Sequence, residues 1–214
     1  IGGMTDDLFR ADAYLQDCAS RIVRLDAAGI VLDRTVFYPL GGGQAGDTGT
    51  LLLADGRTLA IADTRKAKDT EGKPTDEILH VPAPGQEALL ATLMPGDAVT
   101  ARIDWERRHR LMRFHTATHL LCHLVAQPVN GCSITPDYAQ LDFHMTDPLD
   151  KDALTAGLAR LVHAAHPRAV GAITDAELDA NPSRVKSWSV QPPRGTGTVR
   201  TIRIGAEADA QIDV

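Results

Sequence analysis

Short runs of apolar and β-branched residues, separated by turn signals, dominate the first half of the chain. The runs cover residues 22–25, 29–32, 49–53, 59–62 and 98–103. Asp55-Gly56 and Pro95-Gly96-Asp97 lie between them and are typical of turns. Several short strands at this spacing predict a small β-barrel or sandwich. Residues 66–75 are polar and are predicted to form a mobile loop.

The pattern changes at Asp104, a suitable N-cap residue, where a helical period begins. The predicted helix extends to about residue 127, before Pro128, and a second one covers residues 150–166. Strand-like runs occupy residues 139–144, 169–173 and 198–204. This order predicts an α+β fold, most simply an antiparallel sheet covered by helices. We therefore expect a β-barrel-like domain over residues 1–103 and an α+β domain over residues 104–214.

Composition narrows the class of protein. Hydrophobic residues make up 43% and charged residues 23%, as in a folded globular protein rather than a disordered chain. No apolar run approaches the roughly 20 residues that a membrane span needs. Residues 1–7 lack a signal-peptide pattern, and Met4 is the expected natural start. Three scattered cysteines form no disulfide framework. We expect a cytoplasmic protein with no membrane partner and no obligatory protein partner.

Two histidines on the first predicted helix are candidate metal ligands. His115 and His119 are four residues apart, so their imidazoles project from one helix face and can share a tetrahedral zinc ion. The spacing alone is equally compatible with two ordinary core or surface histidines, and His123 extends the same face. Thr116 stands where a metalloprotease would carry its glutamate base, which argues against a peptidase.

A glycine-rich segment joins two of the predicted strands; it reads Thr35-Val36-Phe37-Tyr38-Pro39-Leu40-Gly41-Gly42-Gly43-Gln44-Ala45-Gly46-Asp47-Thr48-Gly49. One reason for three consecutive glycines is a backbone that approaches a ligand closely and forms an anion-binding nest. The other is a tight strand connection. The segment has neither the Gly-Lys-Ser/Thr of a P-loop nor a Rossmann fingerprint.

Both segments, in this order and about seventy residues apart, resemble the editing region of alanyl-tRNA synthetases and their free-standing relatives, the AlaX proteins. Gly131, Pro136-Asp137 and Leu141-Asp142-Phe143 add to the resemblance, as do Asn181-Pro182, Val185-Lys186 and Pro192-Pro193. It implies a β-barrel-like domain, followed by an editing domain of the threonyl/alanyl-tRNA synthetase type. It also implies hydrolysis, in trans, of mischarged alanine tRNA carrying serine or, as a second choice, glycine.

The resemblance assigns roles to residues. His115 and His119 become zinc ligands, Thr118 matches a threonine beside the active site, and the loop Gly41, Gly42, Gly43 and Gln44 belongs to the part that selects the substrate. Thr118 is the candidate catalytic-site residue, a polar pocket wall for the serine hydroxyl. The alternative is a purely structural role for Thr118, as a helix residue whose hydroxyl donates to a preceding backbone carbonyl.

The sequence departs from the family in two places. The family completes its zinc site with Cys-Gly-Gly-Thr-His, and we expect this segment beyond Val214. Cys132 or His144 would be substitutes within the chain. Val129 stands where relatives often have a glutamine, and a valine side chain cannot take over the polar role of that glutamine.

Four arginines cluster near the start of the histidine helix: Arg107, Arg108, Arg110 and Arg113. They either form ion pairs with Asp104 and Glu106 on a solvated face, or bind tRNA phosphates. Arg113 is the candidate tRNA-binding residue, and Lys66, Lys68, Lys186 and Arg194 are further basic candidates. Deacylation of another mischarged tRNA, such as seryl-tRNA of the threonine type, and non-catalytic tRNA binding remain the alternative functions.

Overall fold

The structure is a computed structural model that describes residues 4–164, 168–174, 176, 180, 198–204 and 212–213. The chain divides into two compact units, Ile1–Leu111 and Met112–Val214. Each unit is described by itself below. The boundary expected between residues 103 and 104 stays a prediction.

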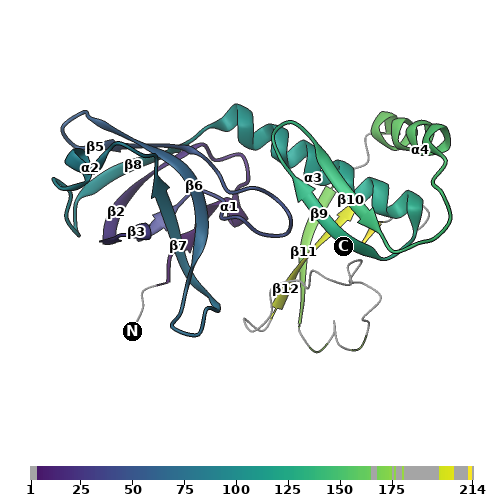
Figure 1. Cartoon of the computed structure of the whole chain (residues 1–214), viewed down its shortest axis with the longest axis horizontal. Coiled ribbons are helices and arrows are strands. Elements are labelled where there is room, and N and C mark those ends of the chain that lie inside the picture. Colours follow the sequence, from purple (N-terminus) through teal and green to yellow (C-terminus); the bar gives the residue numbers. More distant parts are fainter. Residues whose placement is uncertain are drawn as a thin grey trace. The chain divides into compact units, whose positions relative to one another are not determined.

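Six antiparallel strands of the first unit form a closed barrel, in the order β2-β3-β7-β6-β5-β8 (Figure 1). Their bounds are Asp17–Asp26 (β2), Gly29–Leu32 (β3), Gly49–Leu53 (β5), Thr58–Lys68 (β6), Pro74–Pro82 (β7) and Ala98–Ile103 (β8). β8 closes the barrel because it pairs with β2 on one side and with β5 on the other. The small barrel predicted from the short apolar runs is confirmed.

The prediction of a loop over residues 66–75 is wrong at both ends. β6 continues to Lys68 and β7 begins at Pro74, and the two strands pair from Ile61↔Pro82 to Lys68↔Pro74. The register shifts between Lys66 and Lys68, and in the turn that follows the Asp69 carboxylate accepts hydrogen bonds from the Glu71 and Lys73 amides. A hairpin with one face in water carries polar residues at every second position. Its strands therefore lack a continuous apolar run, and their sequence is easily read as a loop.

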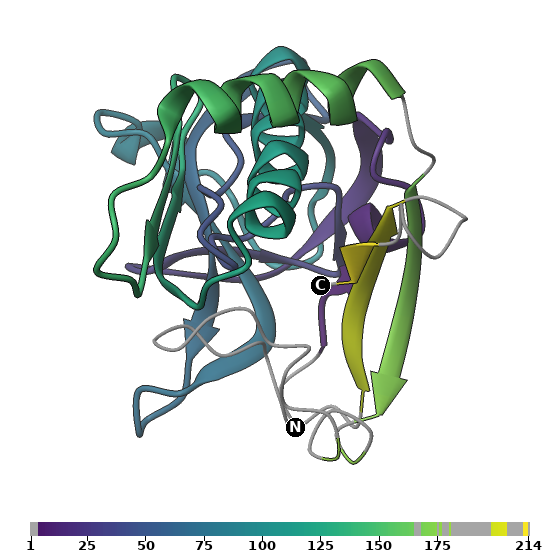
Figure 2. The same ribbon diagram turned by 90° about the vertical axis from the view of Figure 1, so that its right-hand side faces the viewer.

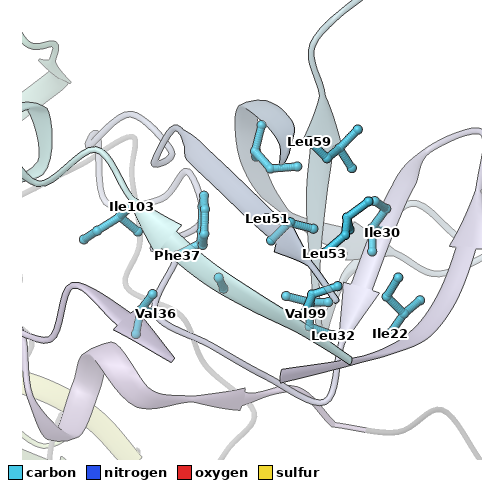
Figure 3. Packing of buried hydrophobic residues seen from close by; sticks show 12 residues of the cluster. Ile22, Ile30, Leu32, Val36, Phe37, Leu51, Leu53, Leu59, Val99 and Ile103 are labelled. Carbon is cyan, nitrogen blue, oxygen red and sulfur yellow. The ribbon is translucent and has the colours of Figure 1, made fainter. Parts of the chain in front are cut away.

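Aliphatic side chains fill the barrel (Figure 3). In β5, Leu51 and Leu53 are buried while Leu52 between them is exposed, as the two-residue period of a strand requires. In β8, Val99, Ala101 and Ile103 are buried in the same way. Each large apolar side chain buried in this way contributes about 1.5–3 kcal/mol.

Short elements complete the first unit. β1 (Asp6–Asp7) pairs in parallel with β4 (Arg34–Thr35), α1 covers Leu8–Ala11, and α2 covers Glu87–Leu90.

Helix α3, Trp105–Val125, begins in the first unit and continues into the second. As expected, Asp104 caps it: its carboxylate accepts the Arg107 amide at 3.1 Å, and its carbonyl accepts the Arg108 amide at 3.0 Å. After the helix, Ala126 takes the left-handed conformation, with φ 54°, and its amide bonds the Cys122 carbonyl.

The second unit contains helix α4, Lys151–Ala164, and two antiparallel sheets among its described residues. One sheet pairs β9 (Val129–Ile134) with β10 (Ala139–Phe143). The other has the order β11-β12-β13, formed by Arg168–Thr174, Thr198–Ile204 and Ile212–Asp213. The single sheet expected from the sequence is therefore two sheets in the described part of the chain.

The two helices pack closely where a glycine allows it. A Cβ atom on Gly157 of α4 would lie 3.0 Å from Cδ2 of Leu124 on α3. Figure 2 shows α4, in green, running across the end of α3. No helix in the described part of the chain is long and apolar enough to cross a membrane.

Candidate functional site

His115 and His119 lie side by side on helix α3, as their spacing predicts. Their ring centroids are 4.9 Å apart and the ring planes differ by 25°. Both side chains are half-buried. Two neighbouring imidazoles match two corners of a tetrahedral zinc site, so the pair fits zinc as half of a ligand set.

No group of three or more His, Cys, Asp and Glu side chains is gathered at one place within the residues that the structure describes. Cys132 and His144, the two substitutes considered within the chain, therefore do not join the histidine pair. His144 instead lies just after β10, where its amide donates to the Pro128 carbonyl at 2.8 Å. Within the described residues, the structure therefore offers a metal ion two imidazoles and no further gathered ligand.

Thr118 lies between the two histidines on α3, directly before His119, and is 5% exposed. Its hydroxyl donates to the His115 carbonyl at 2.6 Å. The hydrogen bond expected for a purely structural Thr118, from its hydroxyl to a preceding helix carbonyl, is thus present in the structure. The bond also commits the hydroxyl proton, so that Thr118 Oγ1 can act toward a ligand only as an acceptor.

The glycines of the predicted substrate loop form a tight turn. The Gly41 amide donates to the Gln44 carbonyl at 3.2 Å, and the Gln44 amide donates to the Gly41 carbonyl at 3.0 Å. Between them, Gly42 and Gly43 have φ values of 59° and 79°. A two-residue turn with φ positive at both positions is the I′ kind that joins antiparallel strands, and it strongly favours glycine.

This turn limits what the loop can offer a ligand. The amides of Gly41 and Gln44 are used within the turn and cannot form an anion-binding nest. Gln44 itself is only 4% exposed, so its side chain faces the protein interior. Of the four predicted loop residues, Gly42 is the exposed one.

Later glycines of the segment are required by close backbone contacts. A Cβ atom on Gly46 would lie 2.1 Å from the Thr64 carbonyl oxygen, and one on Gly49 would lie 2.1 Å from the Arg102 carbonyl oxygen. Both distances are far below van der Waals contact. The segment therefore passes directly against β6 and β8 of the barrel.

Asp47 and Arg108 form a buried ion pair that the sequence did not reveal. Their side chains are 1% and 3% exposed, and Arg108 donates to Asp47 Oδ2 through Nε and Nη2, each at 2.8 Å. Arg108 Nη2 also donates to the Val36 carbonyl, and the Tyr38 amide donates to the Asp47 carboxylate. Burial raises the pKa of Asp47, and the neighbouring Arg108 charge limits this rise.

The other arginines divide between structural contacts and exposure. Arg107 donates to the Gly46 carbonyl at 2.8 Å, so it also holds the first turn of α3 on the glycine segment. Arg110 lies 3.9 Å from Glu106 in an exposed pair. Arg113 is exposed, as a phosphate-binding residue must be. The prediction that Arg108 pairs with Asp104 or Glu106, or binds a phosphate, is wrong, because its guanidinium forms a buried ion pair with Asp47.

The remaining basic candidates are less informative. Lys66 and Lys68 lie at the end of β6, half-buried and exposed respectively. Lys186 and Arg194, like the motif residues 181–182, 185 and 192–193, lie outside the described residues.

His80, on β7, is a buried polar residue that the sequence analysis missed. It is fully buried, its Nε2 lies 2.7 Å from the Thr35 hydroxyl, and its Nδ1 lies 2.9 Å from the Ile30 carbonyl oxygen. A carbonyl can only accept, so Nδ1 carries the proton and Nε2 accepts from Thr35. Desolvation lowers the pKa of His80 to about 4.

Comparisons with known proteins find similarity to class II tRNA synthetases and to alanyl-tRNA editing proteins. The sequence model of the family "tRNA synthetases class II (A)" matches residues 11–107. An alanyl-tRNA editing protein AlaX-M of Saccharolobus solfataricus is 33% identical over 155 residues, which cover 71% of this chain and 60% of that protein.

Two other relatives have a similar sequence identity to this chain. The AlaX-M protein of Methanosarcina mazei is 36% identical over 146 residues, covering 67% of this chain and 55% of that protein. The alanine–tRNA ligase of Ignicoccus hospitalis is 35% identical over 154 residues, covering 69% of this chain but 15% of the ligase. The chain thus spans somewhat more than half the length of the editing proteins that it matches.

Proposed function

The chain is a relative of the AlaX-type editing proteins, and from this we propose that it hydrolyses the ester bond of mischarged alanine tRNA in trans. The observation that carries the proposal is the side-by-side pair His115 and His119 on α3, in a chain with this relationship. An aminoacyl-tRNA is an activated ester, so its hydrolysis needs less catalytic power than peptide cleavage. The serine ester is the proposed substrate, and the glycine ester is the second choice.

Zinc is the proposed cofactor, with His115 and His119 as two of its ligands. A zinc ion bound there would activate water or polarise the ester as a Lewis acid. By the resemblance, the other two ligands would be a cysteine and a histidine. The role of the chain's own helix is to hold two imidazoles one turn apart, so that both reach one ion.

Thr118 is the proposed specificity residue, because of the direction of its hydrogen bond. Its proton is committed to the His115 carbonyl, so its oxygen can accept a proton from a substrate hydroxyl. Serine has that hydroxyl and alanine lacks it. A site that hydrogen-bonds a hydroxyl discriminates strongly against an analogue without one, whereas an apolar pocket discriminates weakly against an added hydroxyl.

Arg113 and the glycine turn are the proposed tRNA and substrate contacts. Arg113 is exposed on α3, two residues before His115, and a guanidinium suits a phosphate of the acceptor end. In the turn, the exposed backbone of Gly42 is the part that remains for a ligand, because Gln44 is buried.

The test is deacylation of seryl-tRNA and alanyl-tRNA, both on alanine tRNA, by the complete gene product with and without a chelator. We expect chelator-sensitive loss of serine with alanine retained. His115→Ala should abolish the activity and lower the zinc content measured by mass spectrometry. His163→Ala, which changes an exposed histidine of α4, is the matched control and should change neither.

Other outcomes select among the alternatives. If the protein hydrolyses serine from threonine tRNA and leaves serine on alanine tRNA intact, the proposal is wrong and the enzyme has a different tRNA specificity. Tight tRNA binding with no hydrolysis of any ester, in a protein loaded with zinc, would leave a tRNA-binding module.

A further inference from the structure

Three rings meet on the surface of the first unit: Tyr14, Trp105 and His109. Trp105 and His109 stack with centroids 5.4 Å apart and planes 20° apart. Tyr14 packs on both, at 5.4 Å from Trp105 and 6.3 Å from His109. We call these three residues the ring cluster.

Strand pairing explains why these residues meet. β2 pairs antiparallel with β8, with Asp17 opposite Arg102, and the Ile103 amide donates to the Gln16 carbonyl. Continuing this register brings Tyr14 opposite Trp105, and His109 follows Trp105 by one helical turn. The Tyr14 amide donates to the Asp12 carboxylate at 2.9 Å, which fixes the turn that presents its ring.

The exposure of Tyr14 argues against a purely structural cluster. Of the nine aromatic residues of the chain, Phe37 is buried in the barrel core cluster and the half-buried Trp105 packs against it. Trp105 therefore has a structural role, and Tyr14 is the ring of the cluster whose position core packing does not explain. A ring that served packing would be buried, yet Tyr14 is 61% exposed. An exposed, pre-ordered tyrosine beside a tryptophan offers a flat surface on which another ring can stack.

Two exposed arginines are close in sequence to residues of the ring cluster. Arg102 lies on β8 three residues before Trp105, and Arg110 follows His109 on α3. Each makes a long, exposed ion pair, at 3.8 Å to Asp17 and 3.9 Å to Glu106. Exposed pairs of this kind contribute little, so both guanidiniums can exchange these partners for a phosphate.

We propose that the ring cluster is a stacking site for an unpaired nucleobase of the tRNA, with Arg102 and Arg110 as contacts for the adjoining phosphates. The combination of aromatic rings for bases and cations for the backbone is the one by which proteins hold single-stranded nucleic acid. The site deepens the proposed function and rests on it for the identity of the RNA. It adds an RNA contact on the first unit that is made by residues other than the histidine pair.

The first experiment measures the affinity of the complete protein for an alanine tRNA transcript. Tyr14→Ala should weaken binding about ten-fold, since loss of one stacking ring has an effect of this order. Tyr14→Phe keeps the ring and should bind like wild type. Tyr138→Ala is the matched control, because Tyr138 is a comparably exposed tyrosine, at 54%, on the β9–β10 hairpin.

The second experiment observes the stacking directly. Trp188→Phe leaves Trp105 as the one tryptophan of the chain. Single-stranded hexa-adenylate should then quench its fluorescence, and a blunt RNA duplex should not. In the Tyr14→Ala background the quenching should require about ten-fold more hexa-adenylate.

Equal tRNA affinity of Tyr14→Ala and wild type, or an equal loss in Tyr138→Ala, would overturn the stacking site. Conversion of a dimer into monomers as the sole effect of Tyr14→Ala would overturn it as well, because the rings would then serve a contact between copies. If editing activity is intact and Tyr14 is neutral, only the stacking site fails. If Tyr14 matters for binding and no ester is hydrolysed, only the proposed catalysis fails.

Discussion

His80 makes the stability of the barrel depend on pH. The imidazole is fully buried and is held neutral between the Thr35 hydroxyl and the Ile30 carbonyl. Protonation would put a second proton on Nε2, opposite the hydroxyl that now donates to it. It would also bury a charge with no carboxylate among the partners of the ring. The pKa of His80 is accordingly lowered to about 4.

The sign and size of the effect follow from linkage. In the unfolded chain the histidine has a pKa of about 6.5. As the pH falls below this value the unfolded state takes up a proton that the folded state refuses, so stability falls. The loss reaches about 2 kcal/mol at pH 5 and about 3 kcal/mol near pH 4, and then levels off. This is a large share of the 5–15 kcal/mol by which domains are stable.

The assay is urea unfolding of wild type and His80→Gln, followed by circular dichroism between pH 7.5 and 5, with a chelator present throughout. His80→Gln loses stability at pH 7.5 because it disrupts both hydrogen bonds, but glutamine does not titrate. The gap between the two proteins should therefore shrink by about 2 kcal/mol over this range. His163→Gln, at an exposed histidine, should run parallel to wild type. A constant gap between wild type and His80→Gln would refute the reasoning.

Three further outcomes are expected. Thr118→Val should lower kcat/KM for seryl-tRNA on the order of 10- to 100-fold while Thr118→Ser retains activity, because valine removes the acceptor oxygen; equal rates for the two variants in deacylation assays would contradict the proposed role. Gly46→Ala should destabilise the first unit by about 3 kcal/mol or more in thermal unfolding, since its Cβ would meet the Thr64 carbonyl, whereas Gly41→Ala, whose Cβ would meet only the Pro39 carbonyl at 3.7 Å, should unfold like wild type. Arg108→Met should cost about 3–5 kcal/mol in urea unfolding by leaving a buried carboxylate uncompensated, and adding Asp47→Asn should restore part of the loss; no recovery in the double variant would argue against the ion pair as the cause.

Local patterns were enough to predict most of the barrel. The five predicted runs all fall within observed strands, because each is a short apolar segment bounded by turn residues. β7 was missed since its apolar run, Ile78–Val81, is short and follows Asp76 and Glu77, whose side chains remain outside the core. β9 was missed for a similar reason: Asn130, Gly131 and Ser133 interrupt its apolar residues.

The candidate site was predictable to the extent that its contacts are local. His115 and His119 are one turn apart, so sequence spacing is sufficient to place their rings together. Asp47 and Arg108 are 61 residues apart. Folding of the barrel brings them into contact, so the sequence around Arg108 does not show that its partner is Asp47 rather than the nearby Glu106. His80 likewise meets Thr35 across 45 residues. Long-range polar pairs of this kind leave no periodic signal in a single sequence.

The glycine segment shows that a family motif can have structural roles in addition to any contact with a substrate. Gly42 and Gly43 supply the positive φ values of a tight turn, and Gly46 and Gly49 avoid collisions with neighbouring backbone. Asp47 then fixes the segment to the first turn of α3 through Arg108. Almost any substitution at these positions would break the turn, the close contact or the buried ion pair, so the motif can persist for structural reasons alone. A loss of editing in variants of Gly46 or Asp47 would therefore be evidence of misfolding first. Gly41→Ala, which the fold accommodates, is the variant whose effect on editing would report on the substrate.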